Sequence, residues 1–193
     1  MEYILQPNRF SRLIANYSLR LRSWKLDINR PPYNKYVLIG APHTSNWDFL
    51  MLLFIKYGGG VDLHWVGKDN AFRGPMNPFF RNLGGIPVNR RSRNNFVSQM
   101  VEVFNQRDEF VLCVAPEGTR KKAEGWKTGF YYIALGAGVP IAMAFVDYRQ
   151  KVVGIGPTVI FPTGDIQADF THIKAFYSGI TGRYPDKQGE IRL

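Results

Sequence analysis

The chain has 193 residues and a formal net charge of +10, with 45% hydrophobic and 21% charged residues. This length and apolar content fit one globular domain with a substantial core, and they exclude an intrinsically disordered chain. A basic surface favours anionic partners such as anionic lipid, nucleic acid or an acidic carrier protein, and charge alone does not choose among them.

Cysteine usage and hydropathy bear on the compartment. Cys113 is the one cysteine, which excludes an internal disulfide framework and favours a reducing compartment. The N-terminus shows no apolar core of a signal peptide. The apolar stretch 130–146 contains two glycines and a proline and is shorter than the roughly 20 residues that a spanning helix needs. We therefore expect a cytoplasmic protein, peripheral at the cytoplasmic membrane face.

Residues 1–30 predict a basic amphipathic helix. Apolar side chains recur there at spacings of three, four and seven, which places them on one helical stripe: Phe10, Leu13, Ile14, Tyr17, Leu21 and Trp24. The arginines of this segment lie largely off the stripe. Two interpretations stay open, because such a stripe can lie in a membrane interface or pack on the core of the domain.

Residues 31–182 alternate between strand and helix patterns, which predicts a single α/β domain with a mixed or mostly parallel sheet flanked by helices. The predicted strands are Tyr36–Ala41, Val61–Val66, Ile86–Val88, Phe110–Ala115, Pro140–Val146, Val152–Ile155 and Val159–Phe161. The predicted helices are Asn46–Tyr57, Asn94–Gln106, Gly125–Leu135 and Asp165–Tyr177, with a broken helix or loop over Ala71–Leu83. The polar residues 183–193 predict a loose C-terminal tail.

The first candidate for chemistry is the sequence Ala-Pro-His-Thr-Ser-Asn-Trp-Asp at residues 41–48. His43 follows a predicted strand, and Asp48 lies in the first turn of the next predicted helix. This offset can bring the carboxylate beside the imidazole, where it would fix the tautomer and stabilise the imidazolium. His43 could then act as a general base toward a hydroxyl. The alternative is that His43 bonds the loop backbone and Asp48 caps the helix.

Two later strand ends also carry charged side chains. Arg90 follows Gly-Gly-Ile-Pro-Val-Asn at 84–89, and its guanidinium could bind a phosphate. Glu117 and Arg120 lie in Ala-Pro-Glu-Gly-Thr-Arg at 115–120. Glu117 could accept from a ligand hydroxyl or hold Arg90 or Arg120, and Arg120 could bind phosphate. Taken singly, each segment also fits a solvated surface loop.

In order, the chain carries His-x4-Asp, Gly-x4-Arg, Pro-Glu-Gly-Thr-Arg and Val-Pro-Ile, over residues 43 to 141. This series resembles the four motifs of the glycerol-phospholipid (PlsC-like) acyltransferase family, whose best-known members are 1-acylglycerol-3-phosphate acyltransferases. The resemblance implies transfer of a fatty acyl group from acyl-CoA or acyl-acyl carrier protein to a hydroxyl of a lysophospholipid. His43 would be the general base, and Asp48 would support it.

The resemblance also implies where the substrates bind. Arg90, Glu117, Gly118 and Arg120 match positions assigned to the acceptor, and Thr119 lies among them. Lys127 is near this third motif and is added to the substrate-binding set. No metal and no organic cofactor are implied, and an anionic membrane surface is the expected further partner.

Three departures from the family pattern leave the acceptor and the acyl-chain pocket open. Lys121 stands where a small hydroxyl residue is frequent, Pro87 replaces an apolar residue in the second motif, and residues 139–144 lack the second proline often found in the fourth motif. The acceptor could be lysophosphatidic acid, another lysophospholipid or a lyso-lipid without phosphate. The alternative from another class is a non-catalytic basic module that binds lipid or nucleic acid.

Overall fold

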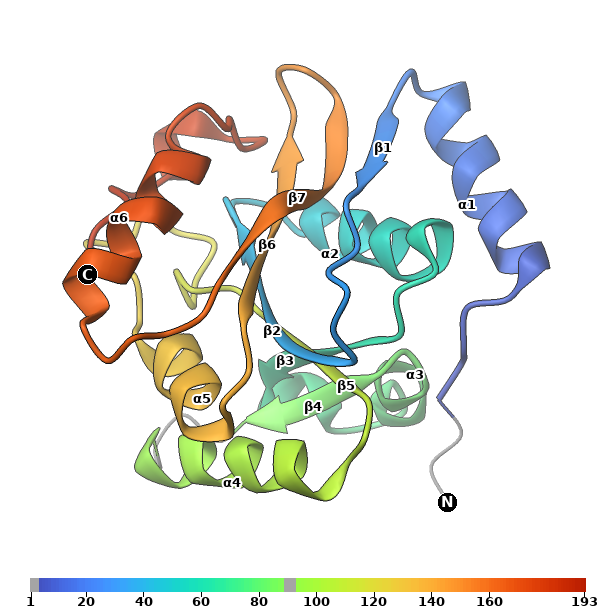
Figure 1. Cartoon of the computed structure of the whole chain (residues 1–193). Coiled ribbons are helices and arrows are strands. Elements are labelled where there is room, and N and C mark those ends of the chain that lie inside the picture. The colour runs from blue at the N-terminus through green and yellow to red at the C-terminus, as the bar shows by residue number, and fades with distance from the viewer. Residues whose placement is uncertain (1–3, 89–92) are drawn as a thin grey trace.

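A seven-stranded sheet with the order β1-β7-β6-β2-β5-β3-β4 forms the centre of the protein (Figure 1). The computed structural model describes residues 4–88 and 93–193. In chain order the strands are β1 (Lys25–Ile28), β2 (Lys35–Ala41), β3 (Leu63–Lys68), β4 (Gly85–Val88), β5 (Phe110–Val114), β6 (Ile141–Asp147) and β7 (Val152–Ile160). Neighbouring strands are parallel except β6 and β7, which form an antiparallel pair. The predicted α/β domain with a mostly parallel sheet is confirmed.

Helices cover both faces of this sheet. They are α1 (Arg9–Leu21), α2 (Trp47–Leu53), α3 (Asn77–Asn82), α4 (Arg93–Gln106), α5 (Gly129–Ala137) and α6 (Ile166–Tyr177), with a π-helical turn η1 (Phe54–Gly58) and 3-10 turns η2 (Asp69–Phe72) and η3 (Pro185–Lys187). The central strand β2 alternates between two cores, since Val37 and Ile39 pack toward α4, α5 and α6, and Tyr36 and Leu38 pack toward α1 and α2 (Figure 1). Burial on both faces accounts for the continuous apolar runs of the central strands.

The elements differ from the sequence-based expectation in three places. The sequence analysis did not predict β1, which adds to the edge of the sheet beside β7. The two short strands expected over 152–161 form one strand, β7. Helix α5 begins at Gly129 rather than Gly125, and in the segment before it the backbone N–H of Trp126 donates to the Arg192 carbonyl at 2.6 Å.

Helix α1 presents its apolar stripe to the outside. The helix begins at a capping box formed by Asn8 and Ser11. Its buried residues are Ala15 and Leu19, on the side toward η1, where a Cβ added to Gly58 would lie 3.4 Å from the Ala15 Cβ. The exposed large side chains are the five residues of the predicted stripe that lie in the helix, namely Phe10 (72%), Leu13 (70%), Ile14 (51%), Tyr17 (69%) and Leu21 (70%). Trp24, the sixth, follows the helix, is half-buried and packs against the core. The interpretation in which the stripe packs on the core is therefore wrong for the five helical residues.

Within the described residues, the structure has no helix that is both long and apolar enough to span a bilayer. The C-terminal segment, residues 183–193, was expected to be loose, and the structure instead holds it against the domain. The backbone N–H of Tyr184 donates to Thr44 Oγ1 at 3.2 Å, and Arg192 Nε donates to the Glu124 carbonyl at 2.6 Å. Both contacts are to loops that follow central strands, so the C-terminal segment lies beside the edge where the candidate chemistry gathers.

Candidate active site

Three neighbouring parallel strands end at the same edge of the sheet. In open α/β sheets, ligands bind at the carboxyl ends of strands. His43 follows β2, Glu117 follows β5 and Tyr148 follows β6, and β2 pairs with both of the other strands. Residues that lie 31 to 105 positions apart in the chain are thereby brought to one place.

His43 and Asp48 form a contacting pair. His43 Nδ1 lies 3.2 Å from Asp48 Oδ2, with side chains 29% and 7% exposed. The backbone N–H groups of Thr44 and Ser45 both donate to the same oxygen at 2.8 Å. An acceptor at Nδ1 places the proton of the neutral imidazole there and leaves the Nε2 lone pair for a substrate. The structure thus brings together the two residues that the sequence predicted as a catalytic pair.

Tyr148 forms a hydrogen bond with the second carboxylate oxygen of Asp48, and the sequence analysis did not predict this residue. Its hydroxyl donates to Asp48 Oδ1 at 2.9 Å. Its ring meets Trp24 edge to face, with centroids 5.1 Å apart, and the Arg183 guanidinium lies 5.8 Å from the ring centroid. The available signal was its place directly after the predicted strand Pro140–Val146, at the same edge as His43.

Glu117 supports the backbone of His43. Its Oε2 accepts from the His43 N–H at 2.6 Å, and the residue is only 4% exposed. Burial raises the pKa of the Glu117 carboxyl to about 7, although the hydrogen bond from His43 opposes this rise. The sequence analysis had weighed a ligand hydroxyl or an arginine as the partner. In the structure this carboxylate instead accepts from the backbone of the loop that carries His43.

The loop after β5 brings Lys127 against the third motif. Gly118 has a φ of +64°, which favours glycine, and a Cβ there would lie 3.0 Å from the Cδ, Cε and Nζ atoms of Lys127. The Lys127 N–H donates to the Pro116 carbonyl at 2.8 Å. Thr119 Oγ1 accepts from the Lys121 N–H at 3.2 Å and so stabilises the turn. Arg90, the remaining predicted site residue, lies outside the described residues.

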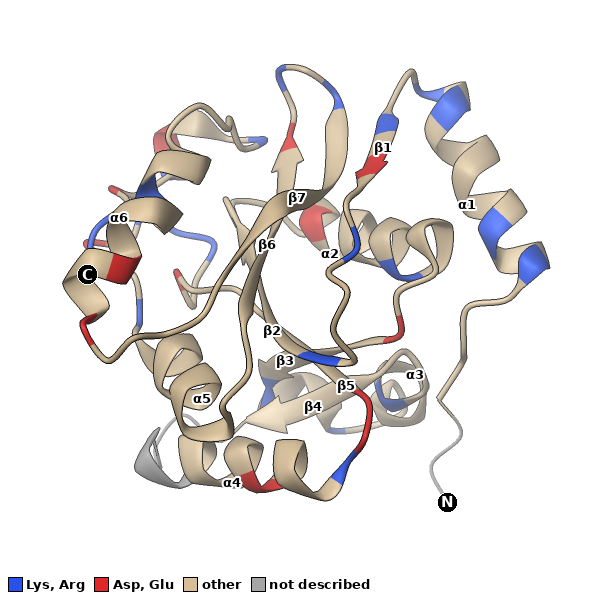
Figure 2. Cartoon of the chain, in the orientation of Figure 1, with Lys and Arg blue, Asp and Glu red and all other residues tan. Residues whose placement is uncertain are grey.

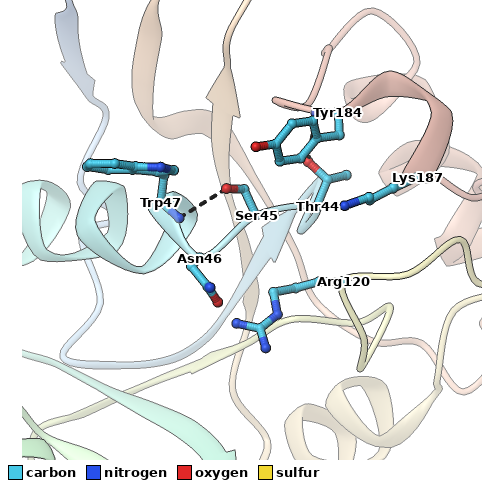
Figure 3. A pocket seen from close by; sticks show the side chains of 7 residues that line it. All are labelled: Thr44, Ser45, Asn46, Trp47, Arg120, Tyr184 and Lys187. Atoms are coloured by element: carbon cyan, nitrogen blue, oxygen red, sulfur yellow. Dashed lines mark hydrogen bonds between the residues drawn. The ribbon is translucent and has the colours of Figure 1, made fainter.

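A polar cavity of about 330 Å³ opens beside the His43–Asp48 loop (Figure 3). Three segments line it: the loop between His43 and Asp48, the third motif, and the C-terminal segment. The lining residues are Thr44, Ser45, Asn46, Trp47, Arg120, Tyr184 and Lys187. None of them is acidic and two are cationic, so the cavity suits an anionic group.

The site contains the parts of a general-base reaction on a substrate with an anionic group. His43 offers Nε2, Asp48 can stabilise the imidazolium, and Arg120 adds positive charge next to them. Across residues 4–88 and 93–193, no group of three or more His, Cys, Asp or Glu side chains is placed to hold a metal ion.

Comparison with known proteins finds similarity to acyltransferases in each case. The family model described as Acyltransferase matches residues 25–146. The chain is 29% identical over 142 residues to the 1-acyl-sn-glycerol-3-phosphate acyltransferase of Haemophilus influenzae, covering 68% of this chain and 55% of that protein. It is 27% identical over 155 residues to the enzyme of the same name from Escherichia coli, covering 76% and 60%. The chain thus spans somewhat over half the length of these relatives.

A solved structure shares the fold. The crystal structure of the 1-acyl-sn-glycerophosphate (LPA) acyltransferase PlsC from Thermotoga maritima matches with a TM-score of 0.61, at 16% sequence identity, over 87% of this chain and 75% of that one. The family model covers more than half of the chain, including the His43–Asp48 pair and the third motif. On this evidence the chain belongs to the acyltransferase family, with a PlsC-like fold.

Proposed function

We propose that the protein moves a fatty acyl group from an acyl thioester, acyl-CoA or acyl-acyl carrier protein, to a hydroxyl of a lysophospholipid such as 1-acylglycerol-3-phosphate. The observation that carries this proposal is the contact of His43 Nδ1 with Asp48, which leaves Nε2 of the partly exposed imidazole available as a base. Membership of the acyltransferase family and the activity for which the relatives are named support the same reaction.

The reaction needs one base that later serves as an acid. The acceptor hydroxyl donates its hydrogen bond to His43 Nε2 and attacks the thioester carbonyl carbon, while its proton passes to Nε2. Asp48 stays ionised and stabilises the imidazolium through Nδ1. The tetrahedral intermediate then collapses, the C–S bond breaks, and the leaving thiolate takes the proton from Nε2. The products are an ester and a free thiol, and the base is regenerated.

The acceptor's phosphate would bind among the cations of the second and third motifs. Arg120 lines the cavity, and Lys127 lies across Gly118 in the same loop. Guanidinium and ammonium groups are the usual side-chain partners of phosphate. Arg90 remains part of this proposal on the basis of its place in the second motif.

We also propose that α1 places the protein on an anionic membrane. The exposed stripe of α1 is apolar, and the helix segment carries Arg9, Arg12, Arg20 and Arg22, all of them exposed, and no acidic residue (Figure 2). An apolar face flanked by arginines is the composition of a helix that lies in the lipid interface. Flotation with anionic vesicles tests this role. The corresponding location is the cytoplasmic face of the membrane.

The first experiment measures thiol release from palmitoyl-CoA and from acyl-acyl carrier protein with a panel of lyso-lipids, with and without phosphate. Wild type is compared with His43→Ala and with His172→Ala, whose histidine is exposed on α6. We expect release that depends on a lyso-lipid, a loss of about 10²- to 10⁴-fold in His43→Ala, and no loss in the control.

Near-normal transfer by a folded His43→Ala variant would refute the role of this residue. If no acceptor-dependent release occurred under any condition, the non-catalytic basic module would replace the enzyme. That module predicts salt-sensitive binding to anionic lipid or nucleic acid with no chemistry.

A further inference from the structure

The cavity beside the base has a wall that comes from outside the family motifs. Tyr184 and Lys187 belong to the C-terminal segment, beyond the residues 25–146 that match the family model. We infer that Lys187 and Arg120 together form a binding site for a phosphate group of a substrate, an inference that rests on the proposed function.

The fold holds this wall in place. The Tyr184 N–H donates to Thr44 Oγ1 at 3.2 Å. The Gln188 side chain connects the C-terminal segment to the residues just before it. Its Oε1 accepts from the Gly182 N–H at 3.1 Å, and its Nε2 donates to the Ile180 carbonyl at 3.0 Å. A Cβ on Gly182 would lie 3.0 Å from Thr44 Oγ1, so the backbone approaches the motif loop closely. The backbone of the cavity wall is therefore fixed to the domain, while the Tyr184 and Lys187 side chains are exposed.

Both cations lie at the cavity from different segments (Figure 3). Lys187 Nζ lies 4.5 Å from the centroid of the Tyr184 ring, and this cation–π contact limits where the ammonium can go. Arg120 comes from the loop after β5, and the hydroxyls of Thr44 and Ser45 and the amide of Asn46 are near. An ammonium and a guanidinium among neutral polar groups, with no carboxylate in the lining, match the charge and hydrogen-bonding of a phosphate.

The place of the cavity links phosphate binding to the reaction. Residues 44–47 lie between His43 and Asp48 in the chain, so a phosphate bound there lies beside the loop that carries both residues. Such a contact would position the substrate rather than take part in proton transfer. The phosphate could belong to the acceptor head group or to the coenzyme A of the donor, which share this chemistry. A cavity of about 330 Å³ admits either group.

The test uses Lys187→Met, which removes the charge and keeps the length, and Lys187→Arg, which restores a cation. Lys174→Met, at an exposed lysine of α6, is the matched control. Steady-state kinetics are measured while lysophosphatidic acid and acyl-CoA are varied in turn. We expect Lys187→Met to raise one KM by about tenfold, equivalent to the loss of one charge-assisted contact, with kcat within about twofold of wild type. Lys187→Arg should restore most of the KM.

The substrate whose KM rises identifies the phosphate, and a change for lysophosphatidic acid alone assigns the acceptor. Direct titration of the protein with glycerol 3-phosphate and with coenzyme A separates this inference from the proposed function. If the wild type transfers no acyl group but binds one of these ligands in a Lys187-dependent way, the site stands and the reaction does not. Equal KM values and equal affinities in Lys187→Met and Lys174→Met would overturn the inference.

Discussion

At the scale of single residues, Asp48 has hydrogen bonds on both carboxylate oxygens. His43, Thr44 and Ser45 contact Oδ2, and Tyr148 donates to Oδ1 at 2.9 Å. Tyr148 therefore acts together with the Thr44 and Ser45 N–H groups in fixing which oxygen faces the imidazole. We expect Tyr148 to be a positioning residue, because it reaches His43 only through Asp48.

Tyr148→Phe removes this hydrogen bond and keeps the ring against Trp24. A hydrogen bond to a charged group contributes about 1.5–3 kcal/mol. Loss of the part of this energy that stabilises the transition state lowers kcat. We expect kcat to fall by about tenfold with the KM of both substrates nearly unchanged. Tyr132→Phe, at an exposed tyrosine of α5, is the control. Equal kcat values for the two variants would show that Tyr148 does not position Asp48.

Glu117 makes stability depend on pH. Its pKa is about 7 in the folded protein, compared with an ordinary value of 4.5, so the folded state binds a proton that the unfolded chain releases. Stability therefore falls as pH rises from 4.5 to about 7 and is constant above that range as far as this group is concerned. Glu117→Gln removes the titration and keeps an acceptor for the His43 N–H.

Urea unfolding of wild type and Glu117→Gln at about pH 5 and about pH 8 tests this dependence. As the pH rises from about 5 to about 8, the free energy of unfolding of wild type should fall by about 2–3 kcal/mol more than that of Glu117→Gln. The exposed Glu109→Gln should show no such difference from wild type. A difference between wild type and Glu117→Gln that does not change with pH would contradict the raised pKa of Glu117.

Sequence reasoning predicted the candidate residues better than their partners. The His43–Asp48 spacing across a strand-to-helix turn was enough to predict their contact. The partners of Glu117 and Tyr148 depend on which strands are neighbours, and strand order is not contained in local patterns. Glu117 therefore contacts a backbone N–H for which no side-chain motif exists.

At the scale of elements, the pairing of strand β1 with β7 depends on a close approach of the two backbones at Gly154. Gly154 of β7 is paired with Asp27 of β1, and a Cβ there would overlap the Asp27 carbonyl oxygen. We expect Gly154→Ala to disrupt the β1–β7 pairing and to lower the free energy of unfolding by about 2–4 kcal/mol. Gly129→Ala places its Cβ in open space at the start of α5 and should be neutral or slightly stabilising. Chemical denaturation compares the two variants, and equal stabilities would mean that β1 tolerates displacement.

Elements with strong apolar patterns were predictable, and the edge strand β1 was not. Strand β2 and helix α6 have apolar patterns set by burial, and they form where the sequence predicts them. Strand β1 has only four residues, alternately exposed and half-buried, so it lacks the apolar run of a buried strand. The stripe of α1 shows which residues share a face, but the side that meets the domain depends on the close approach at Gly58.

At the scale of the whole molecule, the segment after α1 contacts the candidate active site. Trp24 follows α1 and packs on Tyr148, which contacts Asp48. Binding of the exposed face of α1 to lipid would therefore hold the His43 edge of the sheet close to a membrane. A lyso-lipid that stays partly embedded could then reach the base. The net charge of +10 strengthens attraction to an anionic surface.

Vesicle flotation tests this arrangement with the double variant Phe10→Ser, Leu13→Ser. Both side chains are exposed, so we expect an unchanged free energy of unfolding and at least about tenfold weaker binding to anionic vesicles, through lost apolar burial. The control pair Leu135→Ser, Phe161→Ser changes exposed apolar residues away from α1 and should bind like wild type.

The contribution of charge to vesicle binding can be measured separately through its dependence on salt concentration. Raising the ionic strength from about 0.1 M to about 1 M shortens the Debye length from about 10 Å to about 3 Å, and wild-type binding to anionic vesicles should weaken accordingly. Neutral vesicles should bind more weakly and show little dependence on salt, since only the apolar face of α1 contributes there. Equal binding by the two double variants would instead place the membrane contact on another face of the protein.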